Sequence, residues 1–159
     1  MKKPFIYGKY EKQEAEALAC FEASYTGVTT LDSYSSTTYG THYDVYGTNR
    51  RGQDEHIELK LRDENADKYP TAYIEPEKWQ NLLRDYRDLP NKPLPIYINY
   101  IGNEKNVYVW DLSHIKNAQW HASLWIDGME QDRIGLNWKD AWHFMKQPDG
   151  HYKIMNKGK

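Results

Sequence analysis

The chain has 159 residues, which suits one domain with one hydrophobic core. Its formal net charge of -2 excludes the strongly basic overall field of many nucleic-acid-binding proteins, so an anionic partner would need a local basic patch or bound cations. The single cysteine, Cys20, excludes an internal disulfide, and the amino-terminal residues lack an apolar run of signal-peptide or membrane-span length. These features favour a soluble, intracellular, cytoplasmic protein with no membrane partner.

The first predicted element is a helix over residues 10–25, YEKQEAEALACFEASY, which is rich in Ala, Glu and Leu. Gly27 stands where a glycine commonly follows the carboxyl end of a helix. Apolar side chains recur at helical spacings and are expected to face a core, namely Ala15, Leu18, Phe21 and Tyr25.

The next segment changes to Thr, Tyr, Val and Ser, which favour strands. We expect strands over 28–36, 41–47 and 54–62. The stretch TNRRGQD turns the chain between the last two strands. If Arg50, Arg51 and Gly52 form a three-residue loop with Gly52 in the left-handed conformation, Asn49 faces Gln53.

The second predicted helix lies in AYIEPEKWQNLLRDYRDLP, where Pro76 suits the first helical position and Pro90 ends the helix. Its apolar stripe is expected to comprise Trp79, Leu82, Leu83 and Tyr86. Two strands follow, PIYINYI and NVYVWDL, with GNEKN as the turn between them.

The carboxyl-terminal third is harder to interpret. QWHASLWI suggests a strand and NWKDAWHFMK a short helix, followed by a basic tail. The whole order is helix, three strands, helix, two strands and an appendage, which indicates a mixed α/β or α+β fold. We expect a single domain over 1–159, with a core at about 10–112 and an appendage at about 113–159.

The third strand, DEHIELKLR, separates its side chains onto two faces. Ile57, Leu59 and Leu61 are expected in the core, whereas His56, Glu58, Lys60 and Arg62 share the other face. The predicted loop also sets the register between the two arms of the hairpin, and counting back five pairs from Asn49 places Asp44 opposite Glu58. Directly opposed carboxylates destabilise a sheet unless a positive charge lies between them. A slip of one residue would abolish this pairing.

A divalent cation with Lys60 beside it would satisfy this pair of carboxylates. Mg²⁺ or Mn²⁺ prefers hard oxygen ligands such as those of Asp44 and Glu58. Phosphodiester hydrolysis needs charge stabilisation on the phosphate and a nucleophilic water, which a bound metal and a nearby lysine supply. The alternative interpretation is an ordinary solvated strand face, since Glu and Lys two positions apart are common on strands.

The segment YDVYGTNRRGQDEHIELK resembles the core motif of the PD-(D/E)XK nuclease superfamily, which has the restriction-endonuclease-like fold. That motif places an acidic residue on one strand of a hairpin and Glu-x-Lys on the next, and the matching positions are Asp44, Glu58 and Lys60. Tyr43 stands where the motif name has proline. The family's order of helix, three-stranded meander, helix and strands is similar to the order expected over residues 10–112.

The resemblance implies a further carboxylate on the first helix that helps to hold the metal. In the resolvase-like branch this Glu precedes an Ala by three positions and an apolar residue by seven. Glu14, with Ala17 and Phe21, fits that spacing. Glu16 is the alternate.

Several other residues have two interpretations each. Basic side chains around the hairpin would bind phosphate or be ordinary surface charge, namely Arg50, Arg51, Arg62, Lys68 and Lys78. His42 and His56 flank the carboxylates and could be auxiliary ligands or bases. The many Tyr and Trp residues could stack on bases, but they are expected mainly in the core.

Two functional hypotheses follow from the sequence. The first is a Mg²⁺-dependent nuclease in which Asp44, Glu58 and Glu14 bind metal, Lys60 positions the water, and nucleic acid, with DNA favoured, is the substrate. A homodimer would suit cleavage of two strands. The second is a non-catalytic module on the same fold that binds nucleic acid or protein, which the acidic charge balance and the Trp-rich carboxyl-terminal third favour.

Overall fold

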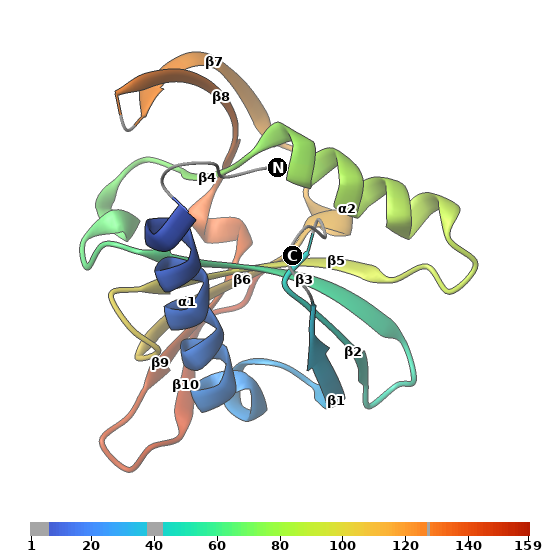
Figure 1. Cartoon of the computed structure of the whole chain (residues 1–159). Coiled ribbons are helices and arrows are strands. Elements are labelled where there is room, and N and C mark those ends of the chain that lie inside the picture. The colour runs from blue at the N-terminus through green and yellow to red at the C-terminus, as the bar shows by residue number, and fades with distance from the viewer. Residues whose placement is uncertain (1–6, 38–42, 127) are drawn as a thin grey trace.

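The computed structural model describes residues 7–37, 43–126 and 128–159, with side chains from residue 12 onward. Within these ranges it is an α+β fold with a mixed seven-stranded sheet, a smaller three-stranded sheet and two α-helices (Figure 1). The coarse class expected from the sequence is therefore confirmed. None of the helices among the described residues is long and apolar enough to cross a membrane.

The large sheet has the order β1-β2-β3-β5-β6-β9-β10. Its strands are β1 (Leu31–Ser36), β2 (Val45–Asn49), β3 (Asp54–Arg62), β5 (Leu94–Ile101), β6 (Asn106–Asp111), β9 (Trp142–Lys146) and β10 (Tyr152–Asn156). The first three strands form an antiparallel meander. The chain then crosses through α2 (Pro76–Asp88) into β5, which pairs parallel with β3, and the remaining neighbours pair antiparallel.

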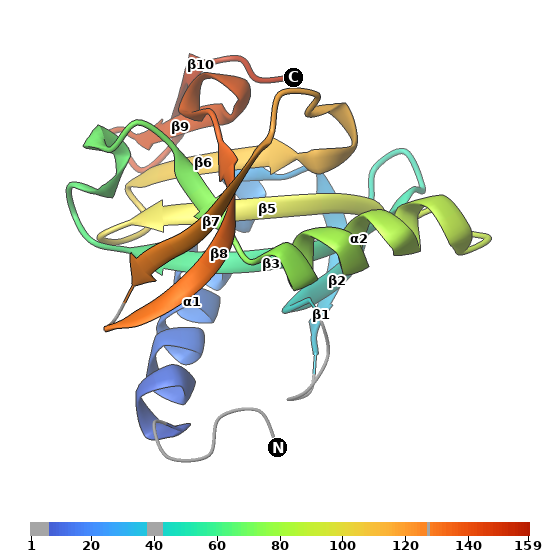
Figure 2. The ribbon, with the colours of Figure 1, turned by 90° about the horizontal axis from the view of Figure 1, so that it is seen from above.

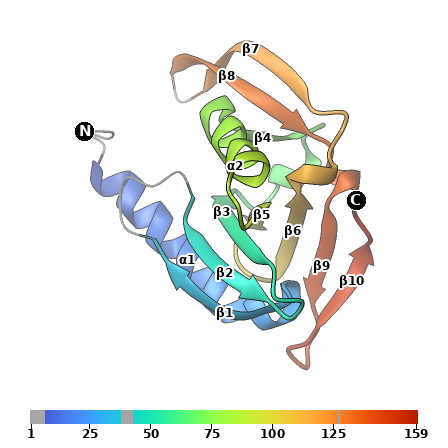
Figure 3. The same ribbon diagram turned by 90° about the vertical axis from the view of Figure 1, so that its right-hand side faces the viewer.

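The small sheet has the order β4-β8-β7 and lies on the α2 side of the large sheet (Figures 2 and 3). It comprises β4 (Ala72–Ile74), β7 (Gln119–Ile126) and β8 (Met129–Leu136). Short 3-10 turns at 66–68, 112–114 and 138–140 connect the elements. The hairpin of β7 and β8 arches over α2 in Figure 3.

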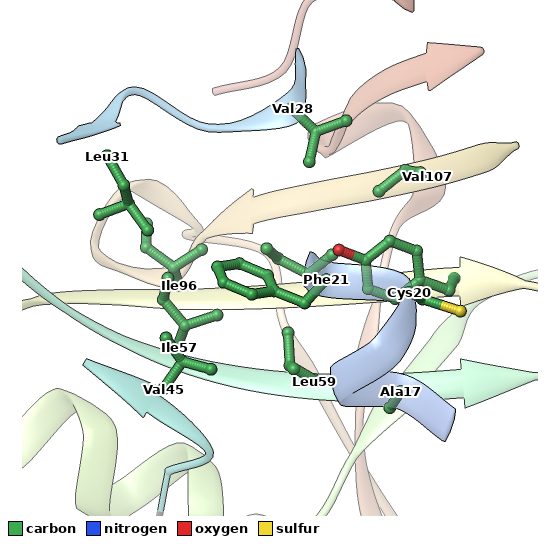
Figure 4. Packing of buried hydrophobic residues seen from close by; sticks show 12 residues of the cluster. Ala17, Cys20, Phe21, Val28, Leu31, Val45, Ile57, Leu59, Ile96 and Val107 are labelled. Atoms are coloured by element: carbon green, nitrogen blue, oxygen red, sulfur yellow. The ribbon is translucent and has the colours of Figure 1, made fainter. Parts of the chain in front are cut away.

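One hydrophobic cluster lies between α1 (Tyr7–Val28) and the sheet (Figure 4). Phe21 and Ala17 from the helix meet Ile57 and Leu59 of β3, as the alternation on that strand predicts. A second cluster fills the opposite face between the large sheet, α2 and the small sheet, and includes Leu82. The two faces of β3 are therefore both covered, which decides the environment of Glu58.

The first helix is longer than expected, and the prediction that Gly27 follows its end is wrong because the helix continues to Val28. A Cβ atom at Gly27 would lie 2.3 Å from Cδ2 of Tyr152, so the glycine permits close packing of β10 against the helix. Thr29 caps the helix instead, because its hydroxyl donates to the carbonyl of Tyr25 at 2.7 Å.

The second helix agrees with its prediction, since it begins at Pro76 and ends at Asp88, before Pro90. Ala72–Ile74, which belong to the segment in which the helix was predicted, instead form β4. The expected strand at 28–36 begins only at Leu31, and the strand expected at 41–47 is observed at Val45–Asn49. Residues 41 and 42 of that prediction lie outside the described ranges.

The carboxyl-terminal third differs most from expectation. The short helix predicted at 137–146 is wrong, because this segment forms a 3-10 turn followed by β9, which pairs with β6. The residues expected as a basic tail include β10, the edge strand next to β9. Burial by partners distant in the sequence therefore overrides the helical spacing of the segment.

Candidate active site

The hairpin between β2 and β3 has the predicted turn and register. Gly52 has a φ of 77° in the left-handed region, and its N–H donates to the carbonyl of Asn49 at 2.9 Å. Asn49 in turn donates its N–H to the carbonyl of Gln53 at 2.9 Å. Val45 pairs with Ile57, as the predicted register requires, and Asp44 directly precedes Val45, outside the strand.

Asp44 lies just before β2 and is bound to β3 through both backbone and side chain. Its N–H donates to the carbonyl of Ile57 at 2.8 Å, and its Oδ2 accepts the N–H of Leu59 at 2.7 Å. Asp44 therefore contacts both residues that flank Glu58, Ile57 through its backbone N–H and Leu59 through its carboxylate.

Glu58 is buried, with 3% of its surface exposed, so the interpretation of its strand face as solvated is wrong. Helix α2 and the small sheet cover this face. Burial raises the pKa of Glu58 to about 8, although Lys78 opposes the shift; Asp44 adds to it. The effect of Asp44 on this pKa reflects the opposed carboxylates that the sequence predicts.

Lys78 reaches Glu58 from α2, with Nζ 2.5 Å from Oε2. The same ammonium lies 3.3 Å from Oε2 of Glu75, one helical turn earlier. Burial favours a lower pKa for Lys78, but the carboxylates of Glu58 and Glu75 outweigh it and raise that pKa. Burial likewise favours a higher pKa for Glu75, but Lys78 and then Lys60 outweigh it and lower that pKa to about 2.

Lys60 is half-buried on β3, two residues beyond Glu58 and therefore on the same face. Burial lowers the pKa of its ammonium, while Glu75 acts to raise it. We call Asp44, Glu58, Lys60, Glu75 and Lys78 the charged cluster. It combines three carboxylates with two ammonium groups, which come from β3, from the residue before β2 and from the start of α2.

The other basic residues of the prediction lie differently. Arg62 is bound within the protein, because its guanidinium donates to the Asn99 side chain, the Tyr73 carbonyl and the Tyr97 hydroxyl. Arg50 and Arg51 are exposed in the turn of the hairpin, six and seven residues beyond Asp44 and therefore roughly 20 Å from it along an extended strand. Lys78 is the predicted phosphate-binding residue that the structure brings to the carboxylates.

Of the residues predicted to assist the carboxylates, Glu14 and His56 do not gather around them in the described structure. Glu14 is exposed on α1, whose buried residues Ala17 and Phe21 pack on the opposite face of β3 from Glu58. His56 stacks on Tyr43 at a centroid distance of 3.9 Å, and its Nδ1 lies 3.4 Å from Oδ2 of Asp85. His42 lies outside the described residues.

The residues present fit a two-carboxylate metal site rather than a three-carboxylate one. Across the described ranges, no three or more His, Cys, Asp or Glu side chains form a group that could hold a metal ion, so Glu14 does not join Asp44 and Glu58 in such a group. Mg²⁺ commonly uses one or two carboxylates and keeps several waters. Asp44 and Glu58 are the two carboxylates that would supply such a pair, and burial is the main cause of the raised pKa of Glu58.

Sequence reasoning missed Glu75 and Asn99 at this site. Glu75 directly precedes Pro76, so its position at the start of α2 could be predicted from the sequence. Its approach to Lys78 and Lys60 depends on how the helix packs. Asn99 pairs with Lys60 across the parallel strands β3 and β5. Its strand was predicted, but the parallel pairing that brings it to Lys60 was not.

Comparisons with protein-family models, with curated proteins and with solved structures found no match for this chain.

Proposed function

We propose that the protein is a Mg²⁺- or Mn²⁺-dependent nuclease with a restriction-endonuclease-like core. The observation that supports the proposal is the end of the hairpin between β2 and β3: Asp44, just before β2, accepts the N–H of Leu59 and acts on the pKa of the buried Glu58, and Lys60 lies two residues beyond Glu58 on the same strand face. Three residue types of the motif therefore lie together in the folded chain, although they come from two elements. DNA is the favoured substrate.

The order of elements supports the same proposal. A helix, an antiparallel three-strand meander, a crossing helix and a strand parallel to the third occur in that sequence along residues 7–101. The two helices lie on opposite faces of the sheet. This is the order that the resemblance to the PD-(D/E)XK superfamily implies.

Asp44 and Glu58 would hold the metal, which would stabilise charge on the phosphate and activate a water. Lys60 would orient that water or offset phosphate charge. Lys78 would bind phosphate once a cation takes over its role of neutralising Glu58. Arg50 and Arg51 stay predicted contributors to nucleic-acid binding, whereas Glu14 lies on α1, on the other face of β3, and Arg62 is bound within the protein.

One observation favours the second function, a non-catalytic binding or assembly module. Lys78 already pairs with both Glu58 and Glu75, so the cluster can neutralise itself and tie α2 to β3 without a metal. In that case the charges serve the fold, and the protein binds a partner through another surface.

The test uses purified protein with labelled single-stranded and double-stranded DNA and RNA, in Mg²⁺, Mn²⁺ or a chelator. The proposal predicts cleavage of at least one substrate that requires metal and disappears in Glu58→Gln. Glu64→Gln, which changes an exposed carboxylate on the loop after β3, is the matched control and is expected to cleave normally. Binding without cleavage under every metal condition would favour the non-catalytic module.

A further inference from the structure

Asn99 is a fully buried side chain next to the charged cluster. It pairs with Lys60 across β3 and β5, just as Tyr97 pairs with Glu58. Its side chain shares the face of Tyr97, which belongs to the cluster covered by α2 and the small sheet. Neither the sequence motif nor the function proposed above uses it.

The orientation of the Asn99 amide is fixed by Arg62. The Nε of Arg62 donates to Oδ1 of Asn99, and because a guanidinium has no acceptor, the oxygen rather than the nitrogen must face it. Arg62 is held in turn by the carbonyl of Tyr73 and, at 2.8 Å, by the hydroxyl of Tyr97. The amide nitrogen is therefore turned away from Arg62.

Nδ2 of Asn99 has no well-aligned hydrogen-bond acceptor in the described part of the chain. Burial raises the pKa of the Tyr97 hydroxyl and a hydrogen-bonding contact from the Asn99 side chain lowers it, but that contact falls outside good hydrogen-bond geometry. The same hydroxyl already donates to the Tyr73 carbonyl at 2.7 Å and accepts from Arg62. A buried donor without an acceptor costs about 1–3 kcal/mol, and most buried polar groups avoid that cost. A donor retained under these conditions, beside Lys60, indicates that a ligand oxygen is its partner.

We propose that Asn99 Nδ2 and Lys60 Nζ together donate to one anionic oxygen of a bound phosphodiester. Asn99 is then a further catalytic residue, and Arg62 is its positioning residue. Fixed donors directed at an oxygen that gains charge in the transition state each contribute strongly to rate. The inference rests on the proposed nuclease function and names a donor pair within the same site.

The first test compares cleavage by Asn99→Asp and Asn99→Leu with the wild type. Asn99→Asp keeps the size and the acceptor for Arg62 but loses the donor, whereas Asn99→Leu removes both. Each is expected to lower turnover about 100-fold, the effect of removing one such donor. Asn103→Asp is the control, since its oxygen can still accept the Lys105 N–H and it lies on an exposed turn.

Thermal unfolding identifies variants that fail to fold, and Asn99→Asp carries the test if Asn99→Leu is among them. Full turnover in a folded Asn99→Asp protein would overturn the inference while leaving the nuclease proposal intact. Thermal unfolding and turnover, measured together, therefore distinguish loss of the hydrogen-bond donor from loss of the fold.

The second test does not depend on cleavage. The side-chain amide signal of Asn99, assigned by its absence from the Asn99→Asp spectrum, is followed by nuclear magnetic resonance as inorganic phosphate or a thymidine dinucleotide is added with Mg²⁺. A saturable shift is expected in the wild type and is expected to be lost or greatly weakened in Lys60→Ala. An unchanged signal at the highest concentration of both probes would overturn the inference. A shift in a protein that cleaves nothing would remove the nuclease proposal and the catalytic role of Asn99, and would keep only the oxygen-binding donor pair.

Discussion

At the residue scale, Glu58 is a strand carboxylate that is buried close to a second carboxylate, Asp44. Burial raises the pKa of Glu58 to about 8, and the nearby Asp44 adds to that shift, so the charged form of Glu58 is disfavoured. Lys78 offsets this cost from α2. Buried carboxylates with perturbed pKa values are often found at functional sites, so this pair of residues is a candidate functional site.

The first prediction concerns metal binding at this pair. Mn²⁺ or Mg²⁺ is expected to raise the melting temperature of the wild type, because a cation that binds the folded state stabilises it. Asp44→Asn should lose most of that increase, since it removes one of the two charged ligands. Differential scanning fluorimetry with and without metal measures both. An equal metal response in Asp44→Asn would contradict the assignment.

The second prediction concerns the carboxylate that the resemblance implies on α1. Both Glu14 and Glu16 are exposed, so Glu14→Gln and Glu16→Gln should unfold at nearly the wild-type temperature. If Glu14 assists the metal, Glu14→Gln lowers cleavage and Glu16→Gln lowers it less. Initial cleavage rates at saturating Mg²⁺ measure the difference. The reverse order would assign the role to Glu16.

At the scale of elements, local sequence was informative where the determinants are adjacent in the chain. The Asn49–Gln53 turn was predictable because one glycine in a three-residue loop fixes the register of both arms. Helix α2 was predictable because Pro76 and Pro90 bracket an amphipathic stripe. The pairing of Val45 with Ile57, which brings Asp44 to the part of β3 that contains Glu58, follows from that turn.

Elements whose partners are distant in the chain were not predictable in the same way. β9 owes its conformation to pairing with β6, and β4 to pairing with β8. Glu75 joins the charged cluster only because α2 packs across the sheet, and Asn99 only because β5 runs parallel to β3. Local spacing carries no information about such packing.

The third prediction concerns α1 and its contact with β10. Gly27→Ala should destabilise the protein, although alanine ordinarily favours a helix by about 1 kcal/mol over glycine, because the added methyl would meet the Tyr152 ring. Moving that ring would also disturb the hydrogen bond from the Tyr152 hydroxyl to the Glu104 carbonyl, which is 2.6 Å long.

Urea unfolding measures the effect of Gly27→Ala. Ala23→Gly, at an exposed position of the same helix, is the comparison and should cost about 1 kcal/mol through helix propensity. A more stable Gly27→Ala protein would show that β10 does not pack on the helix as described.

At the scale of the whole molecule, Cys20 reports on the core between α1 and the sheet. The thiol is buried in that cluster, and burial raises its pKa to about 11. A raised pKa favours the protonated thiol, so at pH 8 about one folded molecule in a thousand carries the reactive thiolate. In the unfolded chain the thiolate fraction is far larger.

The fourth prediction follows from this burial. Native protein at pH 8 should react with iodoacetamide at the rate of global unfolding, and urea should accelerate the reaction steeply because it opens the core. Mass spectrometry over time measures the labelled fraction. Rapid labelling of the native protein, with no dependence on urea, would contradict the packing of α1 on the sheet.

Lys60→Ala tests the central claim most directly. If Lys60 acts on the water or the phosphate in the transition state, single-turnover cleavage with Mg²⁺ should fall by orders of magnitude, while nucleic-acid affinity falls by about one phosphate contact. Metal binding should persist, because an ammonium is not a ligand, and Lys153→Ala, on exposed β10, should cleave normally. Undiminished metal-dependent cleavage by Lys60→Ala would contradict the account.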